Sequence, residues 1–313
     1  MDISIIVPVV ERYDDLRKLY TEYSTAFDKL NKSYEFVFVV SGNFSEAVEC
    51  LKELKSENPS VMVIKLIKDF GESVALQRGV EKAKGDYIFT LASYFQVEPE
   101  AISTIWEELN NGYDLVIARR YPRIDSRINR IQSLIFHWLI KRMTSISFHD
   151  ISCGLRGMKR KVLEEINLYG DLHRFIPILA DKCGFNIKEI KAKQRGEDTT
   201  MRLVGSGTYV RRLLDILTVF FISKFTMKPL RFFGLVGITF FGIGSIITAY
   251  LGVYRLFGFG GIADRPLLLM GILLMVLGIQ TLSIGLIGEI LIFTHAREIK
   301  EYKIEEYLNT DES

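Results

Sequence analysis

The chain has 313 residues, of which 48% are hydrophobic and 25% are charged, and its formal net charge is +2. This balance is that of an ordinary globular protein that is long enough to bury a large core. The net charge itself says little about nucleic acid, and no nucleic acid is expected as a partner.

Strand-like and helix-like segments alternate along the first 120 residues. Runs rich in β-branched and aromatic residues predict strands at 4–9, 34–40, 61–67, 87–91 and 114–118. Stretches of helical periodicity, such as 14–30 and 99–110, lie between them. The alternation predicts an α/β fold with a Rossmann-like, mostly parallel sheet and helices on both faces. The first residues lack a basic leader, so they predict a strand and no secretory signal.

The carboxyl ends of parallel strands are where ligands bind, so a site is expected after Val40 and after Leu91. No glycine-rich dinucleotide fingerprint follows the first strand, and Gly205-Ser206-Gly207 is too short to count as one. A nicotinamide-dependent dehydrogenase is therefore not expected.

Two later stretches, 127–143 and 209–225, are amphipathic and basic. Helices of this kind lie in the headgroup region of a membrane or pack on a sheet. Both alternatives stay open for the first stretch, whereas the second abuts a hydrophobic segment and favours the membrane surface.

Charged residues nearly vanish from Phe232 to Tyr254 and again from Pro266 to Thr294, and each segment is long enough to cross a bilayer. The cations beside the outer ends of these segments are Lys224, Lys228, Arg231, Arg297, Lys300 and Lys303. Only Arg255 and Arg265 lie between the segments. This bias predicts a two-span protein of the inner membrane with both termini in the cytoplasm. The membrane lipid itself is thus an expected partner.

The second span contains one small-residue face and one carboxylate. Gly271, Gly278 and Gly285 recur every seven residues, which predicts either packing of the two spans or a homo-oligomer. Glu289, near the end of this span, is expected to snorkel or to pair with Arg297.

The three cysteines are Cys50, Cys153 and Cys183. Their odd number and their spacing indicate reduced cytosolic thiols better than a disulfide framework or a zinc site.

A series of short motifs occurs in the order of a known family. The motifs are ISIIVP at 3–8, DFGESVAL at 69–76, AKGDYI at 83–88, DISCGLR at 150–156, HRF at 173–175, KPLR at 228–231 and GE at 288–289. With these motifs and the two spans, the chain resembles the family 2 glycosyltransferases of the GT-A fold. The branch is the polyprenyl-phosphate one, which includes dolichol-phosphate mannose synthase and bacterial undecaprenyl-phosphate glucosyltransferases.

The resemblance runs over nearly the whole chain. It implies a membrane glycosyltransferase that moves a sugar from a nucleotide sugar to a polyprenyl phosphate on the cytosolic face, for cell-surface glycan assembly. The expected organisation is a cytosolic GT-A domain at 1–205, a juxtamembrane amphipathic helix at 206–231, a two-helix transmembrane anchor at 232–294 and a cytosolic tail at 295–313.

The chain departs from the family where the donor would bind. An Asp-X-Asp motif normally follows the fourth strand and holds a divalent metal, whereas this chain has Ala92-Ser93-Tyr94. The aspartate-rich turn after the second strand is replaced by Ser41-Gly42-Asn43. The resemblance implies Mg²⁺ or Mn²⁺ as cofactor. Gln96 remains as a candidate ligand, but one neutral oxygen does not hold such a hard cation.

The resemblance implies roles for particular residues. The catalytic candidates are Asp150 and Arg156. The donor-binding candidates are Pro8, Val10, Glu11, Ser41, Ser93, Tyr94, Gln96 and Arg120. The candidates for the acceptor phosphate are Arg123, Arg174, Arg195 and Arg202. A guanidinium keeps its charge and pairs bidentately with phosphate, so arginines would have to meet the charge that develops on the leaving diphosphate. Each of these arginines could instead be a solvated surface charge or form a salt bridge. Asp150 could instead cap a helix or turn.

Two hypotheses follow. An active glycosyltransferase of this kind would turn over in the presence of a chelator. A catalytically degenerate relative would instead bind lipid, nucleotide or a partner enzyme as a membrane scaffold. A processive polysaccharide synthase is not expected, because neither Trp106 nor Trp138 lies in the acceptor motif that such enzymes share.

Overall fold

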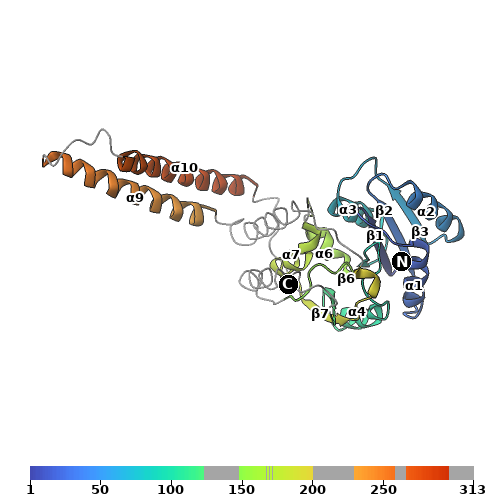
Figure 1. Ribbon diagram of the computed structural model, residues 1–313. Helices are drawn as coiled ribbons and strands as arrows, with labels where there is room; N and C mark the ends of the chain where they lie inside the picture. The colour runs from blue at the N-terminus through green and yellow to red at the C-terminus, as the bar shows by residue number, and fades with distance from the viewer. Residues whose placement is uncertain are drawn as a thin grey trace, which may run out of the picture. The chain divides into compact units, whose positions relative to one another are not determined.

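The computed structural model describes residues 1–122, 148–166, 168, 170, 172–199, 229–257 and 266–295. The chain divides into two compact units. The described part of the first ends at Thr199, and the second is a pair of long helices (Figure 1). Arg123, Arg202, the stretch 127–143, most of the expected juxtamembrane helix and nearly all of the tail lie outside the described residues.

The first unit is built on a seven-stranded sheet in the order β3-β2-β1-β4-β6-β5-β7 (Figure 1). The strands are β1 (Ile3–Val9), β2 (Tyr34–Val40), β3 (Val61–Lys65), β4 (Tyr87–Thr90), β5 (Leu115–Arg120), β6 (Arg156–Lys159) and β7 (Ile187–Ala192). All neighbours pair in parallel except β6, which is antiparallel to both β4 and β5. The predicted mostly parallel sheet is confirmed.

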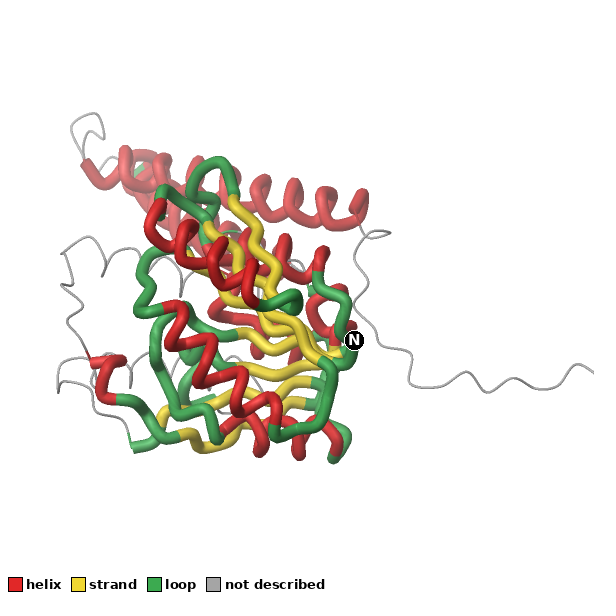
Figure 2. Tube along the Cα trace, turned by 90° about the vertical axis from the view of Figure 1, so that its right-hand side faces the viewer, coloured by secondary structure: helices red, strands yellow, loops and turns green. Residues whose placement is uncertain are grey.

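Helices cover both faces of this sheet (Figure 2). They are α1 (Leu16–Asp28), α2 (Ser45–Glu57), α3 (Glu72–Lys82), α4 (Ala101–Asn110), α6 (Arg160–Glu165) and α7 (Ile176–Lys182), with 3-10 turns η1 (Leu172–Phe175) and η2 (Gly196–Thr199). The side chain of Asp15 caps α1 by accepting a hydrogen bond from the Lys18 amide.

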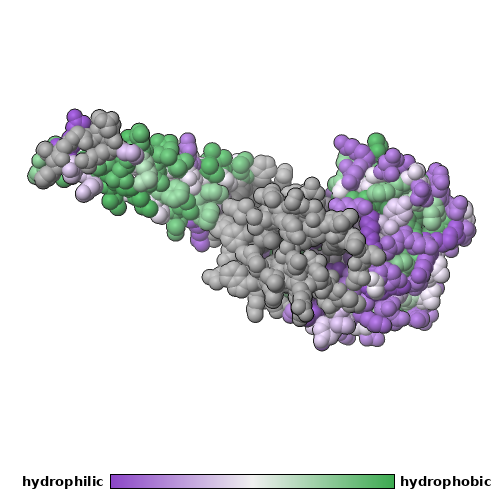
Figure 3. Space-filling model, in the orientation of Figure 1, coloured by the Kyte–Doolittle hydropathy of each residue, from purple (hydrophilic) through white to green (hydrophobic). Residues whose placement is uncertain are grey.

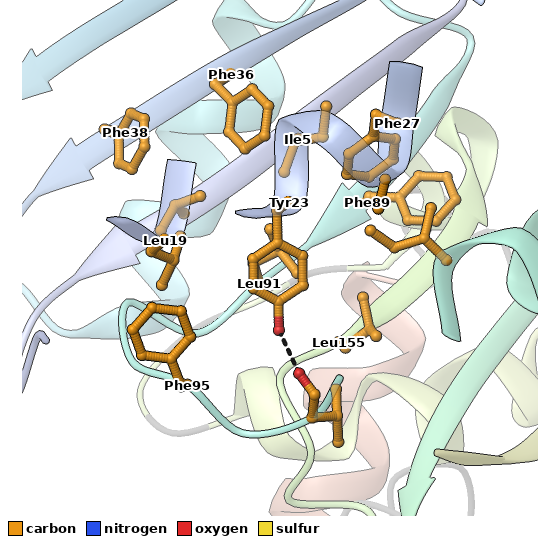
Figure 4. Packing of buried hydrophobic residues seen from close by; sticks show 14 of the residues in the cluster. Ile5, Leu19, Tyr23, Phe27, Phe36, Phe38, Phe89, Leu91, Phe95 and Leu155 are labelled. Atoms are coloured by element: carbon orange, nitrogen blue, oxygen red, sulfur yellow. Dashed lines mark hydrogen bonds between the residues drawn. The ribbon is translucent and has the colours of Figure 1, made fainter. Parts of the chain in front are cut away.

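The main core lies between the sheet and the helices α1, α2 and α4. Side chains alternate along a strand, so Ile3, Ile5, Val7 and Val9 of β1 all enter this core. Figure 4 shows the aromatic centre of the core, where the Phe27 and Phe89 ring centroids are 5.1 Å apart in an edge-to-face contact.

Helix α3 packs on the opposite face of the sheet, against β1 and β2. Its approach depends on Gly79, because a Cβ there would lie 2.5 Å from Cγ2 of Ile6. The same alternation that sends Ile5 into the main core therefore sends Ile6 toward α3.

The second unit consists of α9 (Pro229–Leu256) and α10 (Pro266–His295). Both helices are long and apolar enough to cross a membrane, and most of their apolar residues are not buried in the protein. Their surface is correspondingly hydrophobic (Figure 3). The expectation of two membrane-spanning segments agrees with these helices, which begin at Pro229 and Pro266.

Glycines bring α9 and α10 into backbone contact. A Cβ on Gly237 would lie 2.7 Å from the carbonyl oxygen of Gly278, and one on Gly244 would lie 2.6 Å from that of Gly271. The predicted small-residue face of the second span is therefore used to pack the two spans together. At one end of the pair, the Leu230 amide points to the carboxylate of Glu289 at 3.4 Å.

Candidate functional site

The loops after β1 and β4 meet at the carboxyl edge of the sheet, because these two strands are parallel neighbours. The Ser93 hydroxyl donates to the carbonyl of Arg12 at 2.6 Å, and the Asp14 amide donates to the carbonyl of Ser93 at 2.9 Å. The Phe95 amide donates to the carboxylate of Asp14 at 3.1 Å. Ser93, a predicted donor contact, thus joins the two loops.

The side chains of Arg12 and Tyr94 stack at this edge. The guanidinium carbon of Arg12 lies 4.5 Å from the ring centroid of Tyr94, within the range of a cation–π interaction. Nη2 of Arg12 also donates to the Asp14 carboxylate at 3.1 Å and to the Glu197 carbonyl at 3.2 Å. The sequence placed Tyr94 in the donor site but gave Arg12 no role, because only the pairing of β1 with β4 brings the two together.

Gln96 bridges the two sides of the site. Its Nε2 donates to the Tyr94 hydroxyl at 2.7 Å, and its Oε1 accepts from the Gly154 amide at 2.6 Å. The side chain is buried. Its amide oxygen therefore fixes the loop before β6, and its role as a metal ligand stays a prediction.

A buried ion cluster lies at the end of β5, whose last residue is Arg120. Nε and Nη2 of Arg120 donate to the two carboxylate oxygens of Asp150 at 2.7 and 2.9 Å, and Nη1 donates to Asp198 at 2.9 Å. All three side chains are nearly inaccessible. Burial alone would lower the pKa of Arg120, but its hydrogen bonds to Asp150 and the charges of both carboxylates raise that pKa above the ordinary value.

Arg156 is directed at backbone carbonyls. Its three donor groups reach the carbonyl oxygens of Cys153 at 3.1 Å, of His173 at 2.7 Å and of Ile151 at 2.8 Å. Burial lowers its pKa. The geometry of Arg156 is that of a cross-link between the segment 150–155 and η1, and its catalytic role stays a prediction.

His173 belongs to a second polar cluster beside Arg156. Its Nε2 lies 3.1 Å from the Glu72 carboxylate, and its Nδ1 lies 3.3 Å from the buried hydroxyl of Ser73. The Arg174 Nε faces His173 Nε2 at 3.4 Å. The cluster joins the start of α3 to η1, and it places the half-buried Arg174 there.

The other predicted site residues lie at separate places. Pro8 and Val10 are buried at the end of β1, whereas Glu11 is exposed there. Ser41 is buried after β2 and donates to Asp69 at 3.1 Å. Arg195 bonds to Glu22 and Glu197 and lies over the Phe95 ring. Glu98 lies 4.0 Å from Nη1, so Arg195 stands among three carboxylates.

The residues at the place of the family's metal motif do not fit a divalent cation. The side chain of Ala92 has no ligand atom. The Tyr94 hydroxyl accepts a hydrogen bond from Nε2 of Gln96, and Oε1 of Gln96 accepts one from the Gly154 amide. The charged groups beside this segment are the cationic Arg12 and the Asp14 carboxylate that is paired with it, and that carboxylate accepts the Phe95 amide. Within the described ranges, no group of three histidine, cysteine, aspartate or glutamate side chains is arranged to hold a metal ion.

The family model for Glycosyl transferase family 2 matches residues 4–167 of the chain. The chain belongs to glycosyltransferase family 2. The predicted resemblance is therefore confirmed.

Curated relatives align with almost the whole of this family 2 glycosyltransferase. A dodecaprenyl-phosphate galacturonate synthase from Rhizobium johnstonii is 25% identical over 95% of this chain and 90% of its own length. An undecaprenyl-phosphate 4-deoxy-4-formamido-L-arabinose transferase from Pseudomonas fluorescens is 30% identical over 98% of this chain and 90% of its own length. These alignments include the two long helices of the second unit.

A solved structure of glucosyl-3-phosphoglycerate synthase from Mycobacterium tuberculosis, in complex with Mn²⁺ and UDP-glucose, shares the fold of the first unit. Its TM-score is 0.52 at 15% identity, with 70% of this chain and 78% of that chain covered. The likeness confirms the expected GT-A architecture of the family 2 glycosyltransferase.

Proposed function

We propose that this glycosyltransferase moves a sugar from a nucleotide sugar to a polyprenyl phosphate on the cytosolic face of the inner membrane. The observation that carries the proposal is the near-complete alignment, spans included, with two relatives that are both named for a polyprenyl-phosphate product or acceptor. An acceptor of this kind is itself a membrane lipid, so two membrane-spanning helices would keep the protein in the membrane that contains its acceptor.

The proposed reaction joins two anionic partners. An oxygen of the acceptor phosphate attacks the anomeric carbon of the sugar and forms a new carbon–oxygen bond. The bond from that carbon to the donor diphosphate breaks, and its electron pair leaves with the nucleoside diphosphate. Because the attacking oxygen is already ionised, no strong general base is needed. Positioning and stabilisation of the leaving charge are the main tasks of the protein.

We assign different roles to the charged residues of the site. Arg120 is fixed by Asp150 and Asp198 at the end of β5, so this cluster sets the shape of the donor side. Asp150 and Arg156 act as positioning residues, because their described contacts are to protein groups. Arg174, half-buried beside η1, is proposed to bind the acceptor phosphate.

The remaining predicted contacts complete the proposal. Pro8, Val10, Glu11 and Ser41 line the ends of β1 and β2 and are proposed to hold the nucleotide. Arg123, Arg195 and Arg202 stay as candidates for the acceptor phosphate. The proposed arrangement keeps a cytosolic domain at 1–205, the amphipathic segment at 206–231, the anchor at 232–294 and the tail at 295–313, with both termini cytoplasmic.

A metal has no step in this proposal. The Mycobacterium tuberculosis structure was solved with Mn²⁺ and UDP-glucose, which makes Mg²⁺ or Mn²⁺ the first cofactors to test. The ligands for such a cation are replaced here by Ala92 and Tyr94, so catalysis is proposed to rest on fixed cations of the protein.

The test is transfer from a panel of labelled nucleotide sugars to undecaprenyl phosphate by the detergent-purified full chain, with Mg²⁺, with Mn²⁺ and with EDTA. A labelled lipid product under any of these conditions supports the function. A related active enzyme assayed alongside shows that the lipid is presented correctly. If that enzyme works while this chain neither transfers a sugar nor binds a donor, the proposal is wrong and the membrane scaffold is favoured.

A further inference from the structure

We infer that the guanidinium of Arg12, seated on the ring of Tyr94, takes the place of a divalent cation in holding the donor diphosphate. The inference rests on the proposed function, since the diphosphate is that of the nucleotide sugar. It concerns the one part of the site where the residues present disagree with the metal-binding pattern of the family.

The Arg12–Tyr94 pair lies where a ligand of this fold is expected. Arg12 comes three residues after the end of β1, and Tyr94 comes four residues after the end of β4. The two strands are adjacent and parallel, with Ile6 paired to Thr90, so their carboxyl ends open on the same edge of the sheet. The pair therefore spans the two strand ends between which a donor binds.

The guanidinium is held in place before any ligand arrives. Hydrogen bonds from Ser93 to the Arg12 carbonyl and from the Asp14 amide to Ser93 fix the backbone on both sides. The ring of Tyr94 lies under the guanidinium, and Nη2 donates to Asp14 and to the Glu197 carbonyl. A cation fixed in this way loses little conformational freedom when it meets a phosphate, which favours binding.

The charges of the site favour this assignment. In a metal site, two carboxylates hold the dication, and in the absence of the metal the same carboxylates would repel a diphosphate. Ala92 and Tyr94 carry neither of the two negative charges of the motif, and Arg12 brings a guanidinium to the same place. Asp14 pairs with Nη2 alone, so one carboxylate stands beside Arg12 where the metal motif has two. A guanidinium has five donor hydrogens, stays charged and matches the geometry of phosphate oxygens. The tyrosine ring stabilises this cation through a cation–π interaction.

The first test measures binding of UDP, GDP and dTDP to the detergent-purified full chain by calorimetry, in EDTA and in Mn²⁺. For the diphosphate that binds best, we expect affinities within about twofold of each other in the two buffers. Arg12→Gln is expected to weaken binding roughly 10- to 100-fold, because a charge-assisted hydrogen bond is lost. Arg12→Lys keeps the positive charge but loses the paired donors of the guanidinium, so its affinity for the diphosphate should lie between those of the wild type and Arg12→Gln.

The matched control is Arg17→Gln. Arg17 lies five residues further along the chain, on α1, where its guanidinium pairs with Glu53 and Glu57 on α2. This variant loses the same charge away from the site and is expected to bind the diphosphate as the wild type does.

Tyr94 gives a second, independent measurement. Tyr94→Asp adds a second carboxylate beside Arg12, next to that of Asp14. In EDTA this variant should abolish detectable binding, because the two carboxylates outweigh the guanidinium charge and repel the diphosphate. Tyr94→Phe keeps the ring under Arg12 but removes the hydroxyl that accepts from Gln96, so in EDTA it should bind the diphosphate more tightly than Tyr94→Asp does. Thermal unfolding of each variant shows whether the fold is retained, and if Arg12→Gln unfolds, Arg12→Lys and Tyr94→Asp decide the matter.

Two results would overturn the inference alone. One is a wild-type affinity that rises about tenfold or more with Mn²⁺. The other is a folded Arg12→Gln or Tyr94→Asp variant that binds as the wild type does in EDTA. In either case, sugar transfer by the wild type would leave the proposed function standing. Absence of both diphosphate binding and transfer under every condition would instead overturn the proposed function itself.

Discussion

The carboxylate of Asp150 accepts two side-chain hydrogen bonds from Arg120, 2.7 Å from Nε and 2.9 Å from Nη2. Asp150 also accepts the backbone amide of Arg120 at 3.2 Å. The loop before β6 is thereby fastened to the end of β5 by one buried ion pair. The geometry of this strand end therefore depends on an ion pair that is almost completely buried.

Asp150→Ala is expected to lower the free energy of unfolding by roughly 3–5 kcal/mol, because it leaves the buried charge of Arg120 with Asp198 as its remaining described carboxylate partner. Urea unfolding of the purified chain, followed by near-ultraviolet circular dichroism, measures the change. Glu53→Ala removes an exposed partner of Arg17 and should cost at most about 1 kcal/mol. Equal effects of the two variants would contradict the assigned burial.

Gly244→Leu is expected to separate α9 from α10, since even a Cβ at Gly244 would meet the carbonyl oxygen of Gly271 at 2.6 Å. Overpacking of this kind costs about 1–3 kcal/mol. Unfolding of the micelle-bound protein by titration with dodecyl sulfate measures the loss. Gly242→Leu is the matched control, because a Cβ at Gly242 has no heavy atom within 4 Å. If the control is as damaging, the two helices do not pack through this face.

Cys153 is expected to resist iodoacetamide at pH 8 while Cys50 and Cys183 react. Cys153 is buried, whereas the other two thiols are partly exposed. Burial, with a smaller contribution from the charge of Asp150, raises the pKa of the Cys153 thiol to about 12. Mass spectrometry of the alkylated peptides checks the order of labelling, and early modification of Cys153 in the folded protein would contradict it.

The same thiol makes stability depend on pH in the alkaline range. The pKa of Cys153 is about 12 in the folded protein and 9.0 is its ordinary value, so the folded state holds the proton more tightly. Its contribution is complete below pH 9 and is lost as the pH rises through 12. Urea midpoints between pH 8 and pH 11 should fall less steeply for Cys153→Ala than for the wild type. Identical slopes would show that the thiol does not carry this dependence.

Gln96→Ala is expected to cost about 1–3 kcal/mol, because it leaves the Gly154 amide without its acceptor. The loss should appear in urea unfolding and also as slower sugar transfer, since the loop after β4 loses its tie to the loop before β6. Asn111→Ala, an exposed amide on the surface beyond α4, should change neither quantity. A stable Gln96→Ala protein would show that the bridge is dispensable.

The strands of the first half of the sheet could be predicted from the sequence, because they are runs of buried β-branched and aromatic residues. The predicted run 34–40 coincides with β2, and the predicted run 61–67 is two residues longer than β3. In contrast, β6 has the sequence Arg-Gly-Met-Lys, which carries no strand pattern. It becomes a strand because it is inserted between β4 and β5. Gly157 permits this, since a Cβ there would meet Ile105 at 2.4 Å.

The site could be predicted only in part. Strand order along a sheet is a tertiary property, so the sequence placed the site after Leu91 without showing that Arg12 would reach Tyr94. Charge alone also did not distinguish arginines that face a ligand from those that face the protein. Arg156 was predicted to be catalytic and Arg195 to bind the acceptor phosphate, yet the first binds three carbonyls and the second lies among three carboxylates.

The insertion of β6 also sets an order of folding. β4 and β5 are consecutive strands but are not neighbours, so the chain must leave a gap between them until residues 156–159 arrive. The strands β3, β2, β1 and β4 form a parallel set whose pairings need nothing beyond Thr90. During synthesis, this set can assemble while β5 is still without its inner partner. The half of the sheet formed by β3, β2, β1 and β4 is thereby expected to become structured first, and the half that carries Asp150 afterwards.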